Sequence, residues 1–459
     1  MRADYLILGN SAAGVSAAEV IRACDPAGSI AIASPEPHAV YGRPLISYLL
    51  EGKTSLERIG YKDPDFYDRL GITTLLGEGW AAEGLDAPAH EAVFANGERV
   101  GYGKCLIATG SIPFTPPIEG LADAANTATF LTLDDALQTK ELAEQARRRS
   151  AAQGRESRAI VIGAGLIGLK AAETISHAVD HVLVLELAPR ILPAVLDAQG
   201  AAMLQRMLES HGITCRPGVS AQKILLDDGM ARAAELTDGS IAECDFIVAA
   251  VGVRPNTAFA VASGAQQGRG LVVGTDLQTT LPDVYAAGDV VQVRDTLDGS
   301  QRPLALWPNA VRQGTIVGRH MTGSPAAEPF EGSFAVNAVD FFEASLLTSG
   351  IINPPEDAEG ISCRIDADEQ AGTYAKFVER DGKLVGYILL NRPANAGIYT
   401  WLIENGTPLD SVDPAIFDAA PANLDFDDRT RWERLHACYP SDRDERGFAK
   451  PAASDTATI

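Results

Sequence analysis

Residues 160–168 read Ile160-Val161-Ile162-Gly163-Ala164-Gly165-Leu166-Ile167-Gly168. The apolar start predicts a buried strand, and three glycines at this spacing predict a tight turn into a helix. The first N–H groups of such a helix can receive a pyrophosphate. Glu186 closes the next apolar strand, where a carboxylate accepts hydrogen bonds from a ribose. The stretch predicts a doubly wound α/β unit that prefers NAD to NADP, although Arg190, four residues on, weakens the preference.

A second turn of this kind lies near the N-terminus, where residues 5–14 read Tyr5-Leu6-Ile7-Leu8-Gly9-Asn10-Ser11-Ala12-Ala13-Gly14. Ser11 occupies the place of the usual second glycine, and no acidic residue ends the following strand. Ser34 or Glu36 is the candidate for the adenosine ribose there. Taken alone, these residues fit a dinucleotide site and a turn without ligand equally well.

Strands and helices alternate around both turns, whereas residues 330–420 do not follow this alternation. We expect strands at 4–8, 29–33, 159–162 and 181–186, and helices at 12–23 and 166–178. A charged helical segment spans 131–158; its arginines 147–149 are either a docking patch or a solvated helix face. Residues 330–420 predict a small α+β domain with a hairpin turn at Asp381-Gly382. The polar end, 421–459, is expected to be partly disordered.

Composition narrows the class of partner. The 459 residues hold 38 basic and 61 acidic side chains, a net charge of −23, which disfavours nucleic acid and anionic lipid. No apolar run reaches the ~18 residues of a membrane helix, and the first strand begins too early for a signal peptide. The six cysteines contain no Cys-x-x-Cys and no iron–sulfur or other metal cluster. We expect reduced thiols in a cytoplasmic protein.

Further motifs follow in a fixed order along the chain. They are Tyr41-Gly42-Arg43-Pro44-Leu45-Ile46-Ser47, Leu106-Ile107-Ala108-Thr109-Gly110-Ser111, Val251-Gly252-Val253-Arg254-Pro255-Asn256, Thr280 to Asp289, Trp307-Pro308-Asn309-Ala310 and Gln313-Gly314. With the two turns, they resemble the flavoprotein reductases of the pyridine nucleotide–disulfide oxidoreductase superfamily. The likeness is closest to the rubredoxin reductase, NADH oxidase and nitrite reductase flavoprotein branch, and it covers about residues 3 to 400.

The resemblance implies two Rossmann-like domains, with FAD at the first turn and NAD(H) at the second. It implies an FAD-binding domain at 1–125 and 250–329, an NAD-binding domain at 126–249, a C-terminal interface domain at 330–420 and an extension at 421–459. The predicted FAD contacts are Gly9, Ser11, Ala12, Ala13, Gly14, Ser34, Glu36, Arg43, Pro44, Ala108, Thr109, Gly110, Gly252, Gly288, Asp289, Trp307 and Pro308. The predicted NAD contacts are Gly163, Gly165, Leu166, Ile167, Gly168 and Glu186.

Two departures from the family pattern concern the chemistry. Glu51 stands at or next to the position where peroxidase, oxidase and CoA-disulfide reductase members carry a redox cysteine, and Cys105 is expected in the core. Electrons must then leave the reduced flavin for an external acceptor. Lys170 replaces a glutamate that relatives often place near flavin N5. It either stabilises an anionic reduced flavin or is a surface lysine; Lys170 and Arg43 are the predicted catalytic residues.

The resemblance implies hydride exchange between NAD(H) and FAD, with single electrons passing to or from an iron–sulfur protein. Alternatives are the NAD-reducing flavoprotein subunit of an iron–sulfur 2-oxoacid dehydrogenase complex of the phenylglyoxylate dehydrogenase type, an NADH oxidase, and a nucleotide-sensing subunit without turnover. A homodimer is possible through the C-terminal domain. Phe426, Trp432 and Tyr439 in the extension are expected to anchor on a partner surface, with a frayed tail as the alternative.

Overall fold

The chain forms two compact units in a computed structural model. The structure describes residues 1–459 except 356–357, 393–394, 419–421, 423–424, 428 and 432–459. Unit 1 comprises residues 1–194 and 205–335, and unit 2 comprises residues 195–204 and the chain from 336 onward. Each unit has its own sheets, so the two are described separately.

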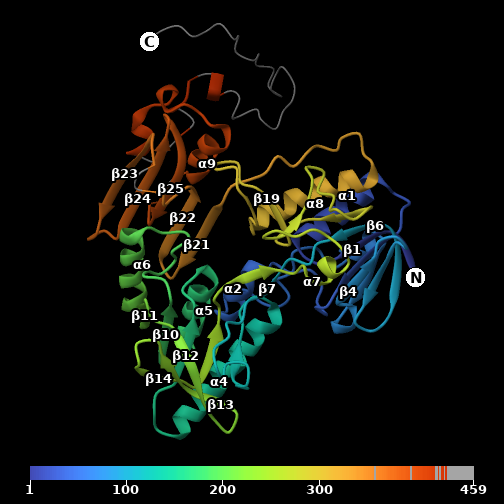
Figure 1. The fold of residues 1–459 in the computed structure, drawn as a ribbon. Helices are drawn as coiled ribbons and strands as arrows, with labels where there is room; N and C mark the ends of the chain where they lie inside the picture. Colours follow the sequence, from blue (N-terminus) through green and yellow to red (C-terminus); the bar gives the residue numbers. More distant parts are fainter. Residues whose placement is uncertain (356–357, 393–394, 419–421, 423–424, 428, 432–459) are drawn as a thin grey trace. The chain divides into compact units, whose positions relative to one another are not determined.

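The first sheet of unit 1 surrounds the N-terminal strand (Figure 1). Its parallel part has the order β3-β2-β1-β6-β18, with bounds Ile72–Leu76, Ile30–Ser34, Arg2–Leu8, Arg99–Ile107 and Val284–Ala286. On the edge that β18 leaves free, the start of β6 pairs antiparallel with β5 (Glu91–Phe94), and β5 in turn pairs antiparallel with β4 (Ala82–Asp86). The inner strands are buried along nearly their whole length, which explains their continuous apolar sequence.

Helices α1 (Ala12–Cys24) and α8 (Trp307–Thr322) pack closely together beside this sheet (Figure 1). A side chain at Gly314 would come within 2.3 Å of the Ala13 carbonyl oxygen, and one at Gly318 within 2.9 Å of the Ala17 oxygen. Glycine at both positions therefore lets the two backbones approach. This contact brings the start of α8 next to the first glycine turn.

The second sheet of unit 1 is wholly parallel, in the order β11-β10-β9-β15-β8. Their bounds are Ile213–Pro217, His181–Glu186, Arg158–Ile162, Phe246–Ala249 and Thr127–Ala128. Helices α4 (Leu133–Ala152) and α5 (Leu166–Ser176) pack on it, and α4 begins with a capping box between Thr132 and Asp135. A separate antiparallel sheet, β12 (Ala221–Asp227), β13 (Met230–Leu236) and β14 (Ile241–Glu243), follows.

Two short strands join the halves of unit 1. β7 (Ser111–Pro113) and β16 (Val253–Pro255) pair antiparallel, so the outgoing and returning segments lie side by side. The Thr109 hydroxyl donates to the Asn256 carbonyl at 2.9 Å, and the Asn256 amide donates to the Gly110 carbonyl at 2.9 Å. The expected linking segment and return crossing are thus directly bonded to each other.

The described residues also form several smaller elements. They are η1 (Arg43–Leu45), α2 (Ile46–Leu50), α3 (Phe66–Arg69), η2 (Glu78–Trp80), α7 (Ala258–Ala262), β17 (Leu271–Val272), β19 (Val291–Arg294), β20 (Gln301–Arg302), η3 (Leu409–Ser411) and η4 (Pro414–Phe417). The α/β fold class with two Rossmann-like sheets is confirmed. The boundaries of the dinucleotide domains inside unit 1 stay predictions.

Unit 2 holds an antiparallel sheet in the order β21-β22-β25-β24-β23, with helix α9 packed on β25 and β22. The bounds are Val336–Phe341, Ala344–Gly350, Lys383–Leu390, Thr373–Arg380, Ile361–Asp368 and, for α9, Ala396–Asn405. Asp381 and Gly382 connect β24 to β25 with φ angles of 52° and 72°, so the predicted hairpin turn is confirmed.

Residues 195–204, which include the start of α6 (Ala198–Ser210), also belong to unit 2. The Asp197 carboxylate accepts a hydrogen bond from the Tyr374 hydroxyl at 2.5 Å and lies 3.1 Å from the Lys376 ammonium. These contacts tie a segment from the middle of the chain to the sheet of unit 2.

Phe426 corrects one expectation about the extension. Its side chain is 3% exposed and meets the Trp401 ring edge-on, with centroids 5.7 Å apart. It therefore packs within unit 2 and is not an anchor for another surface. Trp432 and Tyr439, the other two expected anchors, lie outside the described residues, as does Cys438.

The five cysteines within the described residues are all free thiols. Three of them, Cys105, Cys215 and Cys244, are buried, and burial raises the pKa of the Cys105 thiol in strand β6. A buried neutral thiol is a poor nucleophile. The expectation that Cys105 belongs to the core is confirmed.

Candidate functional site

The first glycine turn requires glycine at both ends. Gly9 has φ of +126°, and a side chain there would come within 2.0 Å of the Ala108 carbonyl oxygen. A side chain on Gly14 would come within 2.1 Å of the Gly9 oxygen. The turn is therefore pressed against the segment 108–110 on one side and against its own helix on the other.

Ser11 lies at the N-cap of α1, but its side chain makes no capping hydrogen bond. The first N–H groups of a helix have no partner within the helix, so those at Ala12 and Ala13 remain available to an anion. Ser11 therefore keeps the helix start open although it replaces a glycine. This arrangement fits a pyrophosphate.

The distant Gly288-Asp289 motif reaches the same turn. Gly288, with φ of +83°, donates its N–H to the buried Gln313 side chain of α8 at 2.7 Å. A side chain on Gly288 would lie 3.3 Å from the Ala13 side chain and 3.8 Å from that of Ala310. Asp289 is thereby held beside the starts of both α1 and α8.

Asp289 has the properties of a carboxylate that lacks enough protein donors. Burial raises its pKa, although Arg43 and a hydrogen bond from Ser111 act in the opposite direction. Hydroxyl donors from a bound ligand would stabilise the charged form. The donor set therefore fits a polyhydroxylated chain such as the ribityl chain of FAD.

Glu36 and Arg43 form a bonded cluster at the end of β2. The Arg43 guanidinium donates to Glu36 Oε1 at 2.6 Å and to the Leu131 carbonyl at 3.3 Å. Tyr41 donates to Glu36 Oε2 at 2.5 Å and accepts the Leu133 N–H at 2.9 Å. Burial alone would lower the pKa of Arg43, but Tyr41, Glu36 and Asp289 raise it, so it is a fixed cation.

Both carboxylate oxygens of Glu36 thus carry protein hydrogen bonds, so an adenosine contact by Glu36 would share them. Ser34, the other candidate, is buried and accepts the Glu36 N–H at 3.3 Å. Pro44 follows Arg43 in η1. Pro308 occupies the first turn of α8, and the Trp307 ring meets the Tyr61 ring edge-on with centroids 4.9 Å apart.

The three glycines of the second turn have different structural roles. Gly163, with φ of +106°, would bring a side chain within 2.4 Å of the Ala250 carbonyl oxygen, and Gly168 would bring one within 2.0 Å of the Gly163 oxygen. Within the described residues, and apart from its own neighbours in the chain, Gly165 has no atom within 4 Å of where its side chain would be. Packing demands the outer two glycines, whereas the middle one leaves open space at the start of α5. That space fits the approach of a dinucleotide.

Glu186 is oriented toward this turn. Its Oε2 accepts the Ala164 N–H and its Oε1 accepts the Ala188 N–H, each at 2.8 Å. Two backbone donors hold the carboxylate in place while further lone pairs remain for ribose hydroxyls. Arg190 donates to the Pro193 carbonyl at 3.3 Å. The cation nearest in sequence is therefore at least partly engaged by its own loop.

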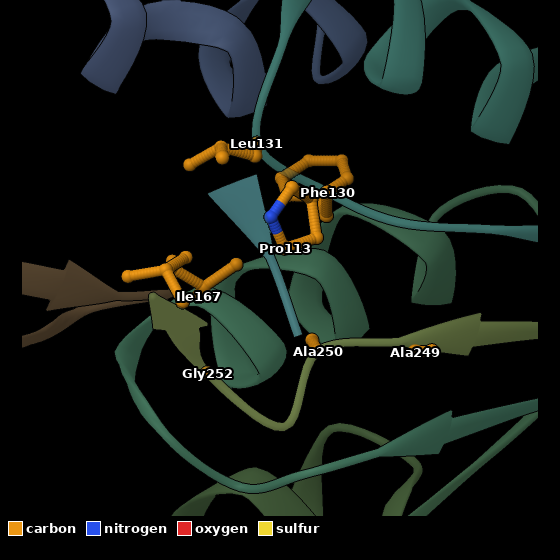
Figure 2. Close-up of a pocket in the computed structure, with 8 residues that line it drawn as sticks. Pro113, Phe130, Leu131, Ile167, Ala249, Ala250 and Gly252 are labelled. Carbon is orange, nitrogen blue, oxygen red and sulfur yellow. The ribbon is translucent and has the colours of Figure 1, made fainter. Parts of the chain in front are cut away.

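A small apolar recess lies beside the second turn (Figure 2). Figure 2 shows the side chains of Leu131, Phe130, Pro113 and Ile167 gathered around it, with the backbone at Ala250 and Gly252 below. Ile167 comes from the first turn of α5, directly after Leu166. Leu131 is the residue whose carbonyl accepts from Arg43, so one wall of the recess is bonded to the FAD-side cluster.

Lys170 is not on the surface. Its side chain is 14% exposed, and its ammonium lies 2.5 Å from Glu173 and 3.6 Å from Glu51. The alternative of an exposed surface lysine is wrong. Its role toward a flavin stays a prediction. Arg147 and Arg148 are exposed on α4, and Arg148 lies 3.5 Å from Glu144, whereas Arg149 is half-buried. The choice between a docking patch and a solvated helix face stays a prediction.

Comparison with known proteins assigns the family. The pyridine nucleotide-disulphide oxidoreductase family profile matches residues 3–314. Subunit epsilon of an NADH-dependent phenylglyoxylate dehydrogenase from Aromatoleum evansii is 30% identical, over 88% of this chain and 92% of its own length. A rubredoxin-NAD(+) reductase from Acinetobacter baylyi is 29% identical, over 85% and 94%. A solved ferredoxin reductase from Rhodopseudomonas palustris has a TM-score of 0.74 at 25% identity, over 85% and 91%.

The chain belongs to the pyridine nucleotide-disulphide oxidoreductase family. It is an oxidoreductase, and the cofactors of this family are FAD and NAD(H). The residues at both turns fit these groups, since the helix starts are open and the carboxylates Asp289 and Glu186 face them. FAD, when bound, supplies the exchange between hydride and single-electron transfer. The chain itself supplies the anion-binding helix starts, the hydroxyl acceptors and the fixed cation Arg43.

The sequence motifs contain Arg43 and Lys170 but not two of their partners. Arg43 donates to the Leu131 carbonyl, and Lys170 pairs with Glu173 on the same helix. Within the described residues no helix is long and apolar enough to cross a membrane. The same residues contain no group of three His, Cys, Asp or Glu side chains placed to hold a metal ion.

Proposed function

We propose that this protein exchanges a hydride between NAD(H) and FAD and passes single electrons to or from an iron–sulfur protein. The observation that carries the proposal is the pairing of two open glycine turns in one unit, while Cys105, the cysteine on the strand beside the first turn, is a buried core thiol. Glu51 stands where thiol-dependent members carry cysteine, and its carboxylate is engaged by Lys53 and Thr174. The electrons then need an acceptor outside the chain. A rubredoxin- or ferredoxin-type protein is the partner we infer, in the cytoplasm.

We assign the predicted contacts accordingly. Gly9, Ala12, Ala13, Gly288 and Asp289 would hold FAD, with the segment 108–110 closing the turn. Gly163, Gly165, Gly168 and Glu186 would hold NAD(H), and the apolar recess around Ile167 would lie on the path toward the flavin.

The test uses the purified protein loaded with FAD, under anaerobic conditions. We expect one equivalent of NADH to bleach the flavin absorbance, and NADPH to do so far more slowly. Added rubredoxin or ferredoxin should then restore the oxidised spectrum faster than oxygen does. No bleaching by either nucleotide would overturn the proposal in favour of a sensing subunit. Rapid reoxidation by oxygen with peroxide or water as product would favour an oxidase.

A second candidate is the NAD-reducing flavoprotein subunit of an iron–sulfur 2-oxoacid dehydrogenase complex. The relative from Aromatoleum evansii favours it, because that relative is itself a subunit and the match covers 92% of its length. Gentle purification from the native source decides between the two. Co-elution with larger iron–sulfur subunits supports the complex, whereas elution alone or as a homodimer supports a separate reductase.

A further inference from the structure

Five side chains form a cluster where α2 meets α5, and none of the cofactor contacts assigned above uses them. The cluster contains Tyr48, Glu51, Lys53, Lys170 and Glu173. The carboxyl-bearing side chains of Glu51 and Glu173 are each only 2% exposed. Buried carboxylates of this kind persist when cations pair with them.

Lys170 connects the two carboxylates. Its ammonium lies 2.5 Å from Glu173 Oε2 on the same helix and 3.6 Å from Glu51 Oε1 on the other side of the contact. Thr174 of α5 adds a hydroxyl donor to Glu51 Oε1 at 3.3 Å. Two consecutive turns of α5 therefore reach Glu51, which caps the C-terminal end of α2.

An aromatic ring completes the contact. The Lys170 ammonium lies 5.3 Å from the centre of the Tyr48 ring of α2, and the Lys53 ammonium lies 5.5 Å from the same ring. Cations over an aromatic face at these distances are attracted to it. Lys170 thus holds α2 at two points, through a carboxylate and through a ring.

The cluster joins a segment that follows the FAD site to the helix that starts at the NAD turn. α2 continues directly from η1, which holds Arg43 and Pro44 of the FAD site. Lys170 follows Gly168 by two residues, in the first half of the helix that starts at the NAD turn. A rigid link between α2 and α5 therefore fixes the flavin side against the nicotinamide side.

The cluster contains two carboxylates and two ammoniums, and each ammonium lies close to a carboxylate. Opposite charges at these distances attract each other. The arrangement is therefore suited to holding two helices together.

We propose that Lys170 is a positioning residue whose pairing with Glu51 clasps α5 to α2 and so sets the geometry of hydride transfer between the two cofactors. The proposal rests on the function proposed above. It also replaces the expectation of direct flavin stabilisation with a mechanical role for the same side chain.

The test compares Lys170→Met with Lys53→Met as the matched control. Lys53 pairs with the same Glu51 carboxylate, but it is 56% exposed and follows α2 in the chain, so it makes no link to α5. We expect Lys170→Met to lower the limiting rate of flavin reduction at saturating NADH by about tenfold or more, since small displacements of reacting groups slow a step this strongly. The dissociation constant of NADH and the flavin midpoint potential should stay unchanged. Lys53→Met should lower this rate much less than Lys170→Met does, because Lys53 and Glu51 both follow α2 and their pairing does not join α2 to α5.

A further variant protects the test against simple misfolding. Lys170→Arg, which keeps a cation beside both carboxylates, should recover part of the lost rate. If Lys170→Met shifts the midpoint potential and the rate follows that shift, the clasp is overturned in favour of direct electrostatic tuning. An unchanged limiting rate overturns it as well.

A readout without cofactors separates this proposal from the proposed function. Amide hydrogen exchange in the cofactor-free protein should rise in α2 and in the first half of α5 for Lys170→Met but not for Lys53→Met. If NADH fails to bleach even the unmodified protein, the proposed function falls while the exchange data still decide the clasp. Equal exchange in both variants overturns the clasp.

Discussion

Substitution of single glycines in the second turn should separate folding from nucleotide binding. Gly165→Ala adds a methyl group where no atom lies within 4 Å, at a backbone φ of −77° that any residue adopts. The cost to the fold is at most about 1 kcal/mol, the difference between glycine and alanine at an N-cap. The apparent Tm should fall by no more than about 4 °C. The methyl group should, however, keep a pyrophosphate from the helix start.

The loss of one charge-assisted hydrogen bond to that pyrophosphate is worth about 1.5–3 kcal/mol, or roughly ten- to hundredfold in the dissociation constant. Titration calorimetry with NAD on the FAD-loaded variant measures it. Unchanged NAD affinity in Gly165→Ala would refute the argument, because the pyrophosphate could then not bind against the start of α5 at Gly165.

Gly163→Ala is the matched comparison in the same turn. Its φ of +106° costs a residue with a side chain about 1–3 kcal/mol, and its methyl group would also lie 2.4 Å from the Ala250 oxygen. We expect a drop in apparent Tm of about 6 °C or more, by thermal unfolding of the cofactor-free protein. A Gly163→Ala protein as stable as Gly165→Ala would contradict the division of tasks between the glycines.

Three further outcomes follow from single carboxylates. Glu186→Gln should lower the ratio of kcat/KM for NADH over NADPH by about tenfold, measured with both nucleotides; an unchanged ratio would remove Glu186 from the ribose contact. Burial raises the pKa of Asp289, so the charged form destabilises the cofactor-free fold increasingly as pH rises through that raised pKa. Asp289→Asn should therefore raise the apparent Tm of the cofactor-free protein near pH 7 while weakening FAD retention; lower Tm and unchanged retention would contradict this. Burial alone would raise the pKa of Asp245, but Arg155 and the Arg158 N–H lower it in the folded protein. The ionised Asp245 therefore stabilises the fold above its pKa in the unfolded chain, and this stabilisation is lost as pH falls through its lower pKa in the folded protein. Arg155→Ala should cost stability near pH 7 and progressively less toward about pH 3, by chemical denaturation; a pH-independent loss would exclude Asp245 as the cause.

The local pattern of apolar residues was sufficient to predict the strands of the parallel sheets. The expected strands at 4–8, 29–33, 159–162 and 181–186 match β1, β2, β9 and β10 to within two residues, because each is an apolar run bounded by a turn. The expected helix at 166–178 ends two residues earlier, at Ser176. The hairpin at Asp381-Gly382 was equally accessible, since a two-residue turn with positive φ needs these residue types.

The sequence could not show which residues from distant parts of the chain pair with each other. Nothing in the local sequence distinguishes a Lys170 that faces solvent from one enclosed by Glu51 and Glu173, since 119 residues separate Lys170 from Glu51. The same holds for Glu36, whose oxygens go to Arg43 and Tyr41. Phe426 has the sequence context of an exposed anchor, yet it packs against Trp401. An aromatic ring amid charged residues can pack within its own domain as well as on a partner, and the sequence does not distinguish the two.

The assignment of residues 195–204 to unit 2 has a consequence for dissecting the protein. A fragment starting at Val336 would lack Asp197, and Lys376, only 10% exposed, would keep a buried ammonium without its carboxylate. An uncompensated buried charge costs about 3–5 kcal/mol, a large part of the stability of a domain of this size. A single proteolytic cut near residue 335 should therefore not release an independently stable C-terminal fragment. Unit 2 must therefore fold together with residues 205–335 of unit 1, which separate its two segments in the sequence.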